Sequence, residues 1–372
     1  MKVRARWMRG GTSKCWVFDA ADLRETGFSA DSALPRIFGS PDLRQLDGVG
    51  GATSTTSKAL IVEPGGIADA DVSYTFAQVG IEEATVDWGS NCGNCSAAVG
   101  LFALENGWVP MTAGVTEVRT LNMNTGQMII QTIPTPEARL PEDPQDSIPG
   151  TVFTGHGVEL GFVAPEGKTT GAVLPAGEAV SAFRAADGRR VRASLVDAGA
   201  PLVMVDAESF GLMPEEYAMW ADLIADRLPE LDRIRRAAAV TMRLVEAPEE
   251  AERAIPKIGL VSAAVEAGSD VQVLMLSMGR PHPAMPITGS VGVTVAARTP
   301  GTTVAECLRG PVGAELRIRI PVGVMSTSTV ERPEGRTVGI RRTARTLADA
   351  QLLVPDRQIE RAAALLTAGA AS

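Results

Sequence analysis

Residues 91–103, "NCGNCSAAVGLFA", form a polar turn that leads into a run of small apolar residues. Residues 286–297, "PITGSVGVTVAA", repeat this pattern in the second half of the chain. Small side chains all round a helix are expected where a sheet encloses it, because only thin side chains fit there. The two segments therefore suggest a duplication, in which each half of the chain is a sheet wrapped around a buried helix.

Short strands account for most of the remaining pattern. Residues 2–7, "KVRARW", alternate between basic and apolar types, which is typical of a half-buried strand. Further strands are expected at residues 57–64, 72–80, 126–135, 191–206, 271–279 and 314–324. Helices are expected at residues 93–108, at 213–244 with an interruption at Pro229, and at 356–369. Many short strands and few helices predict an α+β architecture with rolled antiparallel sheets rather than a doubly wound fold.

The composition excludes several classes of protein. Of the 372 residues, 45% are hydrophobic and 21% charged, which is typical of a globular protein. No run approaches the roughly twenty apolar residues of a membrane span, and the N-terminus lacks the hydrophobic core of a signal peptide. We therefore expect a cytoplasmic protein whose four cysteines are reduced. The net charge of −9, without a cluster of Lys or Arg, argues against a nucleic-acid partner but is compatible with a small anionic ligand.

Cys92 and Cys95 are spaced as Cys-x-x-Cys, which has several interpretations. A structural zinc site needs four ligands, and the other cysteines and the two histidines are scattered, so we expect no metal. A redox pair at a helix start is chemically sensible, but the segment before it does not resemble part of a βαβ unit. Cys95 is expected to be a small buried residue of the helix. Cys92 precedes the helix, where free N–H groups raise the acidity of a thiol, so it is either an acid/base group or a loop cysteine with no task.

Other segments also carry polar groups that can bind or react. Lys58 follows a loop rich in Gly and Thr, and it is either a surface lysine at a strand start or a lysine held over a cleft. The loop lacks the Walker spacing, which excludes a nucleotide-binding P-loop. Residues 8–14, "MRGGTSK", form a turn whose N–H groups can cradle a carboxylate, and residues 278–290 place His282 before the second helix. Two histidines and the lack of a Gly-x-Ser-x-Gly motif argue against a hydrolase triad.

Seven segments of the chain are together characteristic of a known family. In chain order they are "WMRGGTSK", "DGVGGATSTTSKALIV", "NCGNCSAAVGLFA", "NMNTG", "PKIGLVS", "MGRPHPAMPITGSVGVTVAA" and "RRTARTLADAQLLV". In them the chain resembles the methylaconitate isomerase family, which includes 2-methylaconitate cis-trans isomerase and 4-oxalomesaconate tautomerase. The resemblance covers nearly the whole chain. Cys15 and Cys95 depart from the residues frequent in that family, but neither replaces a catalytic group.

The resemblance implies a diaminopimelate-epimerase-like fold with two similar domains, each a rolled antiparallel or mixed sheet around a central helix. Residues 1–185 would form the first domain and residues 186–340 the second. Residues 341–372 would return to the first domain. The active site would lie in the cleft between the two.

The resemblance also implies isomerase or tautomerase chemistry without a cofactor. The family's acid/base pair is a lysine in "TSK" and a cysteine in "NCGN", and these positions are Lys58 and Cys92 here. One group removes a proton allylic to a double bond and the other returns a proton, which moves the double bond or exchanges cis and trans geometry. We expect Lys58 as the base and Cys92 as the acid in the forward direction. The expected substrate is an unsaturated di- or tricarboxylate similar to 2-methylaconitate or 4-oxalomesaconate.

Residues in the matching segments are the candidates for binding the carboxylates. They are Arg9, Gly11, Thr12, Ser13, Lys14, Asn91, Gly93, Asn94, His282, Thr288, Gly289 and Ser290. An amino-acid racemase or epimerase of the same fold is an alternative, although such enzymes use a second thiol where this chain has Ser290. A non-catalytic carboxylate-binding protein and a thiol oxidoreductase that uses Cys92 and Cys95 are further alternatives. A homo-oligomer is compatible with all of these interpretations.

Overall fold

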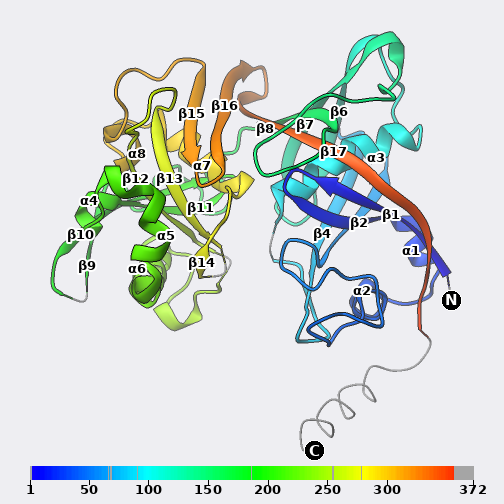
Figure 1. Ribbon diagram of the computed structural model, residues 1–372, viewed down its shortest axis with the longest axis horizontal. Coiled ribbons are helices and arrows are strands. Elements are labelled where there is room, and N and C mark those ends of the chain that lie inside the picture. The colour runs from blue at the N-terminus through cyan, green and yellow to red at the C-terminus, as the bar shows by residue number, and fades with distance from the viewer. Residues whose placement is uncertain are drawn as a thin grey trace, which may run out of the picture. The chain divides into compact units, whose positions relative to one another are not determined.

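The computed structural model describes residues 2–355 except 66, 68, 90, 186, 254 and 278 (Figure 1). Contacts between residues divide the chain into two compact units. Unit 1 comprises Met1–Glu159 and Arg342–Ser372, and unit 2 comprises Leu160–Arg341. The chain passes from unit 1 to unit 2 within strand β8 (His156–Val163) and returns within strand β17 (Gly335–Leu353).

The boundaries of the units differ from the sequence-based division at one place. The first division comes after Glu159 instead of residue 185, because β9 (Ser181–Arg184) pairs antiparallel with β10 (Arg190–Ala198) of unit 2. From Arg342 onward the chain is part of unit 1. The helix expected at residues 356–369 lies outside the described residues.

Unit 1 is built on a mixed sheet. Its strands are β1 (Lys2–Gly10), β2 (Ser13–Asp19), β3 (Lys58–Pro64), β4 (Val72–Val79), β5 (Val86–Asp87), β6 (Gly114–Asn122) and β7 (Gln127–Thr135), with parts of β8 and β17. Its helices are α1 (Ala20–Arg24), α2 (Ala30–Phe38), α3 (Gly93–Glu105) and the 3₁₀ turn η1 (Pro136–Ala138). The strands pair in the order β17–β1–β2–β3–β4–β6–β7, in which β2–β3 and β4–β6 are parallel and the other pairs antiparallel.

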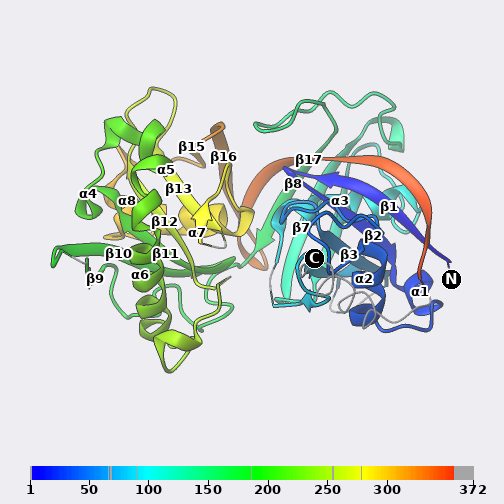
Figure 2. The same ribbon diagram turned by 60° about the horizontal axis from the view of Figure 1, so that its bottom comes forward.

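The sheet of unit 1 encloses the helix α3. All residues from Gly93 to Leu104 are buried, and α3 packs against β1, β2, β3, β6 and β7 (Figure 2). A Cβ atom at Gly100 would lie 2.7 Å from Gln131 Oε1 on β7, so a larger residue does not fit there. The small residues in the segment 91–103 therefore reflect the close approach of the helix to the sheet.

Unit 2 repeats this construction. Its strands are β9, β10, β11 (Ala200–Asp206), β12 (Lys257–Ala263), β13 (Val271–Ser277), β14 (Arg280–Pro281), β15 (Glu315–Ile320) and β16 (Gly323–Arg332). Its helices are α4 (Ala207–Phe210), η2 (Pro214–Met219), α5 (Trp220–Leu223), η3 (Ala225–Arg227), α6 (Leu228–Thr241), η4 (Pro248–Glu250), α7 (Ile287–Ala297) and α8 (Thr303–Glu306). Every residue of α7 is buried, as in α3.

The strand pairings confirm the duplication. The order β1–β2–β3–β4–β6–β7 is antiparallel, parallel, antiparallel, parallel, antiparallel, and β10–β11–β12–β13–β15–β16 follows the same order. In each unit a two-residue strand, β5 or β14, pairs with the fourth strand of this series and precedes the buried helix. The predicted architecture of two similar halves, each a mixed sheet around a central helix, is therefore correct.

The helical region expected at residues 213–244 is divided into η2, α5, η3 and α6. Pro229 does not interrupt a helix but lies in the first turn of α6, where proline has no backbone hydrogen bond to break.

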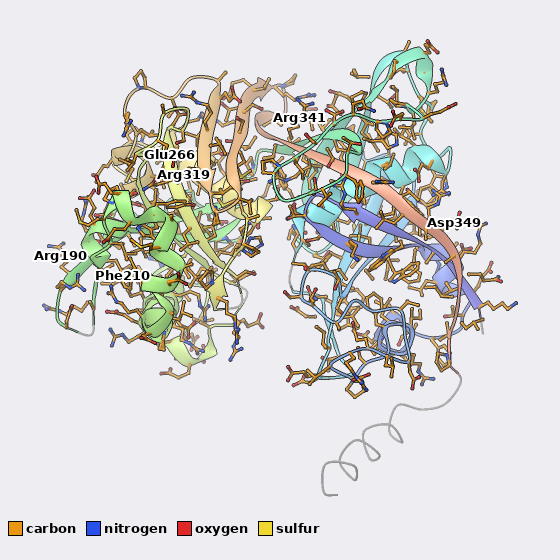
Figure 3. All side chains as sticks on the ribbon, viewed as in Figure 1. Arg190, Phe210, Glu266, Arg319, Arg341 and Asp349 are labelled. Atoms are coloured by element: carbon orange, nitrogen blue, oxygen red, sulfur yellow. The ribbon has the colours of Figure 1, made fainter. Side chains whose placement is uncertain are left out.

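In unit 2, Arg319 of β15 forms an ion pair of 2.7 Å with Glu266 (Figure 3). None of the helices in the described part of the chain combines the length and apolar character of a membrane span.

Candidate functional site

Cys92 stands at the start of α3 as its N-cap residue, with extended backbone angles. The thiol is half-buried, and its Sγ donates toward the hydroxyl oxygen of Ser13 across 3.8 Å. The carbonyl oxygen of Cys92 accepts the first bond of the helix from the N–H of Ser96. The thiol is therefore fixed between the first turn of α3 and the beginning of β2.

The turn between β1 and β2 lies directly on the first turn of α3. A Cβ atom at Gly10 would come within 2.5 Å of the Asn94 carbonyl oxygen, and one at Gly11 within 2.2 Å of Asn94 Oδ1. Gly11 also has a φ of +51°, a conformation that side chains disfavour. Asn94 Oδ1 accepts from the Thr12 N–H at 3.4 Å. Glycine is needed here because the two backbones touch, and the contact brings Gly11, Thr12, Ser13, Gly93 and Asn94 together with Cys92.

Arg9 and Lys14 lie on the other face of the β1–β2 pair. They are register partners, and successive residues of a strand point to opposite faces, so Ser13 points toward α3 and Lys14 away from it. Lys14 Nζ lies 5.2 Å from the ring centre of Trp7. Arg9 donates from Nη1 to the carbonyl oxygens of Gly11 and Thr343 and to Thr343 Oγ1.

Lys58 is the first residue of β3, and it lies on the face of the sheet that covers α3. Its neighbour Ala59 packs with Trp16 in the apolar cluster on the opposite face, so alternation directs Lys58 toward the helix. The Lys58 side chain is buried, with 8% of its surface exposed. Its Nζ donates to Gln78 Oε1 at 2.5 Å and lies 4.9 Å from the ring centre of Phe76.

The electrostatics of the site connect Cys92, Cys95 and Lys58. The pKa of the Cys92 thiol is raised well above its ordinary value, first by contact with the Cys95 side chain and then by burial, while the positive charge of Lys58 opposes the rise. Burial likewise raises the pKa of Cys95, whose side chain also contacts Cys15. The expectation that the helix start makes Cys92 acidic is therefore wrong, because thiol contact and burial outweigh the helix end.

A polar network beneath α3 holds the segment that leads into the helix. Asn122 Nδ2 donates to Asn91 Oδ1 at 2.9 Å. The hydroxyls of Tyr74 and Ser96 are 2.7 Å apart, and Ser96 Oγ donates to the Cys92 carbonyl oxygen. The residues Asn122 and Tyr74 were not among the sequence-based candidates, although Asn122 opens the motif "NMNTG".

The remaining candidates lie at the start of α7 in unit 2. Thr288 and Ser290 are buried, and Ser290 Oγ donates to the Ile287 carbonyl oxygen, so this hydroxyl is bonded within its own helix. A Cβ atom at Gly289 would lie 3.3 Å from Met275 Cε. His282 Nδ1 accepts from the N–H of Ala284 at 3.0 Å. Thr288 and Gly289 therefore offer the backbone of the helix start, as Gly93 and Asn94 do in unit 1.

No set of three or more His, Cys, Asp and Glu side chains in the described part of the chain is arranged to hold a metal ion. The groups of the site that can transfer protons are the Lys58 amine and the Cys92 thiol. One is basic when neutral and the other is a weak acid. Their combination can remove a proton from a carbon atom and return one elsewhere on the same substrate.

Comparison with known proteins identifies the family and agrees with the fold. The family model described as "PrpF protein" matches residues 1–355. A 2-methyl-aconitate isomerase from Shewanella oneidensis is 35% identical over 87% of this chain and 88% of its own. The crystal structure of a methylitaconate-delta-isomerase is similar with a TM-score of 0.80 and 31% identity, covering 95% of both chains.

A more distant similarity identifies the fold alone. The structure of a hydroxyproline epimerase from Agrobacterium vitis superposes with a TM-score of 0.56 at 14% identity, over 95% of this chain and 94% of that chain. Together with the strand order of the two units, it confirms the diaminopimelate-epimerase-like fold that the sequence predicted.

Proposed function

The chain belongs to the PrpF protein family and is an isomerase, and we propose that it moves a double bond or exchanges cis and trans geometry in an unsaturated di- or tricarboxylate. The similar proteins named above are named for 2-methyl-aconitate and methylitaconate, which are unsaturated acids with several carboxylates. In such acids a C–H bond next to the double bond is weakly acidic, because the resulting anion is delocalised. We expect a substrate of this class, similar to 2-methylaconitate or 4-oxalomesaconate.

The observation that carries the proposal is the placement of two proton carriers on the same face of unit 1. Lys58 points toward α3 from β3, and Cys92 begins α3. The raised pKa of Cys92 favours the protonated thiol, which is the form that supplies a proton. This supports Lys58 as the base and Cys92 as the acid in the forward direction.

The proposed reaction has two proton transfers. The neutral Lys58 amine removes the allylic proton, and the electron pair of the broken C–H bond delocalises over the double bond and a carboxylate. Cys92 then protonates the far carbon, which leaves a product, a lysine ammonium and a cysteine thiolate. For cis-trans exchange, the delocalised anion rotates before it is protonated. Transfer of one proton from Lys58 to Cys92, directly or through solvent, restores the starting state.

The substrate's carboxylates need N–H donors, because negative charge grows on a molecule that is already anionic. The N–H groups at the start of α3 supply such donors, and loss of one preorganised donor typically raises a barrier by about 2.7–4 kcal/mol. Within unit 1 we assign this role to Ser13, Gly93 and Asn94, and to the hydroxyl of Thr12, whose N–H is bonded to Asn94 Oδ1. Asn91 is assigned to hold the helix entry, since its Oδ1 is bonded to Asn122.

For Arg9 and Lys14 we propose roles other than the carboxylate binding that the sequence suggested. Both lie on the face of β1–β2 opposite Ser13, and Arg9 uses its donors within unit 1. We propose instead that Arg9 holds the β1–β2 turn against β17. Lys14 is half-buried, with its Nζ 5.2 Å from the ring centre of Trp7.

The alternatives predict other outcomes. A racemase with this fold would use a thiol at the start of α7, where this chain has Ser290 bonded to its own helix. A thiol oxidoreductase needs a reactive thiolate, and both Cys92 and Cys95 have raised pKa values. A non-catalytic binding protein would bind the acids without converting them.

The proposal is tested by incubating the protein with 2-methylaconitate, methylitaconate and 4-oxalomesaconate and following each acid by proton NMR. We expect one of them to isomerise, and Lys58→Ala and Cys92→Ala to lower turnover about 10²–10⁴-fold. Lys14→Ala, a matched lysine on the other face, should keep activity within about threefold. Binding of all three acids without conversion, or full activity of Lys58→Ala, would contradict the proposal.

A further inference from the structure

Gln78 is held so that its carbonyl oxygen faces Lys58. Lys58 and Gln78 are direct partners in the antiparallel β3–β4 ladder, so their side chains leave the sheet side by side. Gln78 Nε2 donates to the Ser57 carbonyl oxygen at 2.8 Å. With the amide nitrogen used in this way, Oε1 is turned to Lys58 Nζ, which donates to it.

The group that orients Gln78 is itself fixed. The Ser57 carbonyl oxygen also accepts from the Val79 N–H at 3.0 Å, and Ser57 Oγ donates to the Val79 carbonyl oxygen at 3.0 Å. Gln45 Nε2 donates to Ser57 Oγ at 2.8 Å. The amide of Gln78 therefore rests on a rigid backbone rather than on a mobile side chain.

Phe76 closes the other side of the lysine. It lies two residues from Gln78 on the same face of β4, it is almost fully buried, and its ring centre is 4.9 Å from Lys58 Nζ. Among the residues that the structure describes, Gln78 is the sole hydrogen-bond acceptor for this nitrogen. Because the lysine side chain is a flexible four-carbon stem, this hydrogen bond to Gln78 fixes the position of its nitrogen.

We propose that Gln78 is the positioning residue that holds the nitrogen of Lys58 in line with the carbon acid during proton transfer. The inference rests on the proposed function and adds a residue to it. An amide oxygen accepts an N–H from the ammonium and from the neutral amine alike. Gln78 therefore keeps the nitrogen in place in both states and leaves the amine's lone pair directed away from β4.

An amide suits this position better than a carboxylate does. A carboxylate would pair with the lysine ammonium and hold its proton, which would slow the removal of a proton from substrate. The titratable groups near this region are the thiols Cys92 and Cys95 of α3 and the exposed carboxylate of Asp87, the β5 register partner of Gln78. Gln78 and Phe76 of β4 carry no charge. Replacing the neutral amide by an acid therefore changes the charge beside Lys58 without altering the length of the side chain.

The test compares Gln78→Met, Gln78→Glu and the control Gln272→Met, using the acid that the wild type isomerises. Gln272 is a fully buried glutamine of unit 2 that also donates to a backbone carbonyl, that of Pro214. Gln78 is half-buried, so the control loses at least as much packing and hydrogen bonding. We expect Gln78→Met to lower kcat about 10- to 100-fold, with KM within about twofold, because the reacting nitrogen is misplaced. Gln272→Met should lower the melting temperature but keep kcat within about threefold.

The split between kcat and KM separates positioning from a structural effect. A merely structural loss lowers the melting temperature and leaves kcat near the wild-type value, whereas a misplaced reacting nitrogen lowers kcat and leaves KM unchanged. Gln78→Glu keeps the length of the side chain and an oxygen acceptor, and it should lower kcat because its carboxylate pairs with the lysine ammonium. If Gln78→Met does not fold, the kcat of Gln78→Glu decides alone.

Lys58→Ala distinguishes a failure of this inference from a failure of the proposed function. If Lys58→Ala keeps wild-type turnover, the lysine is not the base and the proposed function fails with it. If Lys58→Ala is inactive while both Gln78 variants keep kcat within about threefold, the positioning role of Gln78 is overturned and the proposed function stands.

Discussion

The thiol of Cys92 donates toward the hydroxyl oxygen of Ser13, with 3.8 Å between Sγ and Oγ. The two residues come from distant parts of unit 1, and the glycine turn at Gly10 and Gly11 brings them together by lying on the first turn of α3. A hydroxyl that accepts from a thiol favours the protonated form of that thiol. Ser13 therefore supports the role of Cys92 as a proton donor.

Replacing Ser13 by alanine should leave the thiol in place but remove the group that orients it. A hydrogen bond of this kind contributes at most about 0.5–1.5 kcal/mol, so we expect Ser13→Ala to lower kcat no more than roughly 2- to 10-fold. Steady-state kinetics on the isomerised acid measure the effect. A loss as large as that of Cys92→Ala would mean that Ser13 itself transfers the proton.

Cys95→Ala should shift the pH dependence of the reaction. Contact with Cys95 is the largest cause of the raised pKa of Cys92, so its removal lowers that pKa toward the ordinary value. Cys92 acts in its protonated form, and activity is therefore lost as pH rises through its pKa. The basic limb of the kcat profile should move to lower pH, while activity at neutral pH stays within a few-fold of wild type.

Cys15→Ala is the matched control for this shift, because Cys15 contacts Cys95 and is itself fully buried. It should move the basic limb less than Cys95→Ala does. Equal shifts in both variants would contradict Cys95 as the main cause of the raised pKa, and a shift to higher pH would contradict the assignment of Cys92 as the acid.

Gly10→Ala should destabilise unit 1 at the site. The added Cβ would meet the Asn94 carbonyl oxygen and the Cys95 Cα, which are backbone atoms that cannot move aside cheaply. Such overpacking typically costs about 1–3 kcal/mol, and urea unfolding measures it. Gly313→Ala, where nothing lies within 4 Å of the new Cβ, is the control and should change the free energy of unfolding little.

Arg9 should affect stability more than substrate binding. Arg9→Ala removes bonds to Gly11 and Thr343, and we expect it to lower the free energy of unfolding by about 1–3 kcal/mol while KM stays within about twofold. Urea unfolding and steady-state kinetics together decide the role. A rise in KM of tenfold or more at unchanged stability would restore the carboxylate-binding role suggested by the sequence.

Local patterns in the sequence predict the buried helices well. The small residues of α3 and α7 leave room for a sheet on every side, and this property is visible without any structure. The duplication follows from the same two segments. The division after residue 185 is wrong because the β9–β10 hairpin belongs to unit 2, and nothing in its short pattern shows which strand it will join.

The site shows where sequence reasoning ends. Lys58 and Cys92 can be selected from their motifs. The proposed role of Gln78 follows only from the β3–β4 register, which places it beside Lys58. Lys14 is adjacent to Ser13, and strand alternation alone separates their faces. The raised pKa of Cys92 depends on contact with Cys95 and on burial, which compete with the helix end and cannot be weighed from the sequence.

The roles of Lys58 and Cys92 are tested most directly by proton exchange in D2O, followed by proton NMR on the acid that the wild type isomerises. With Lys58 as the base, Cys92→Ala should still exchange the allylic proton of the substrate for deuterium but form almost no product. Lys58→Ala should neither exchange nor isomerise. Rapid exchange by Lys58→Ala, together with none by Cys92→Ala, would contradict this assignment and make Cys92 the base.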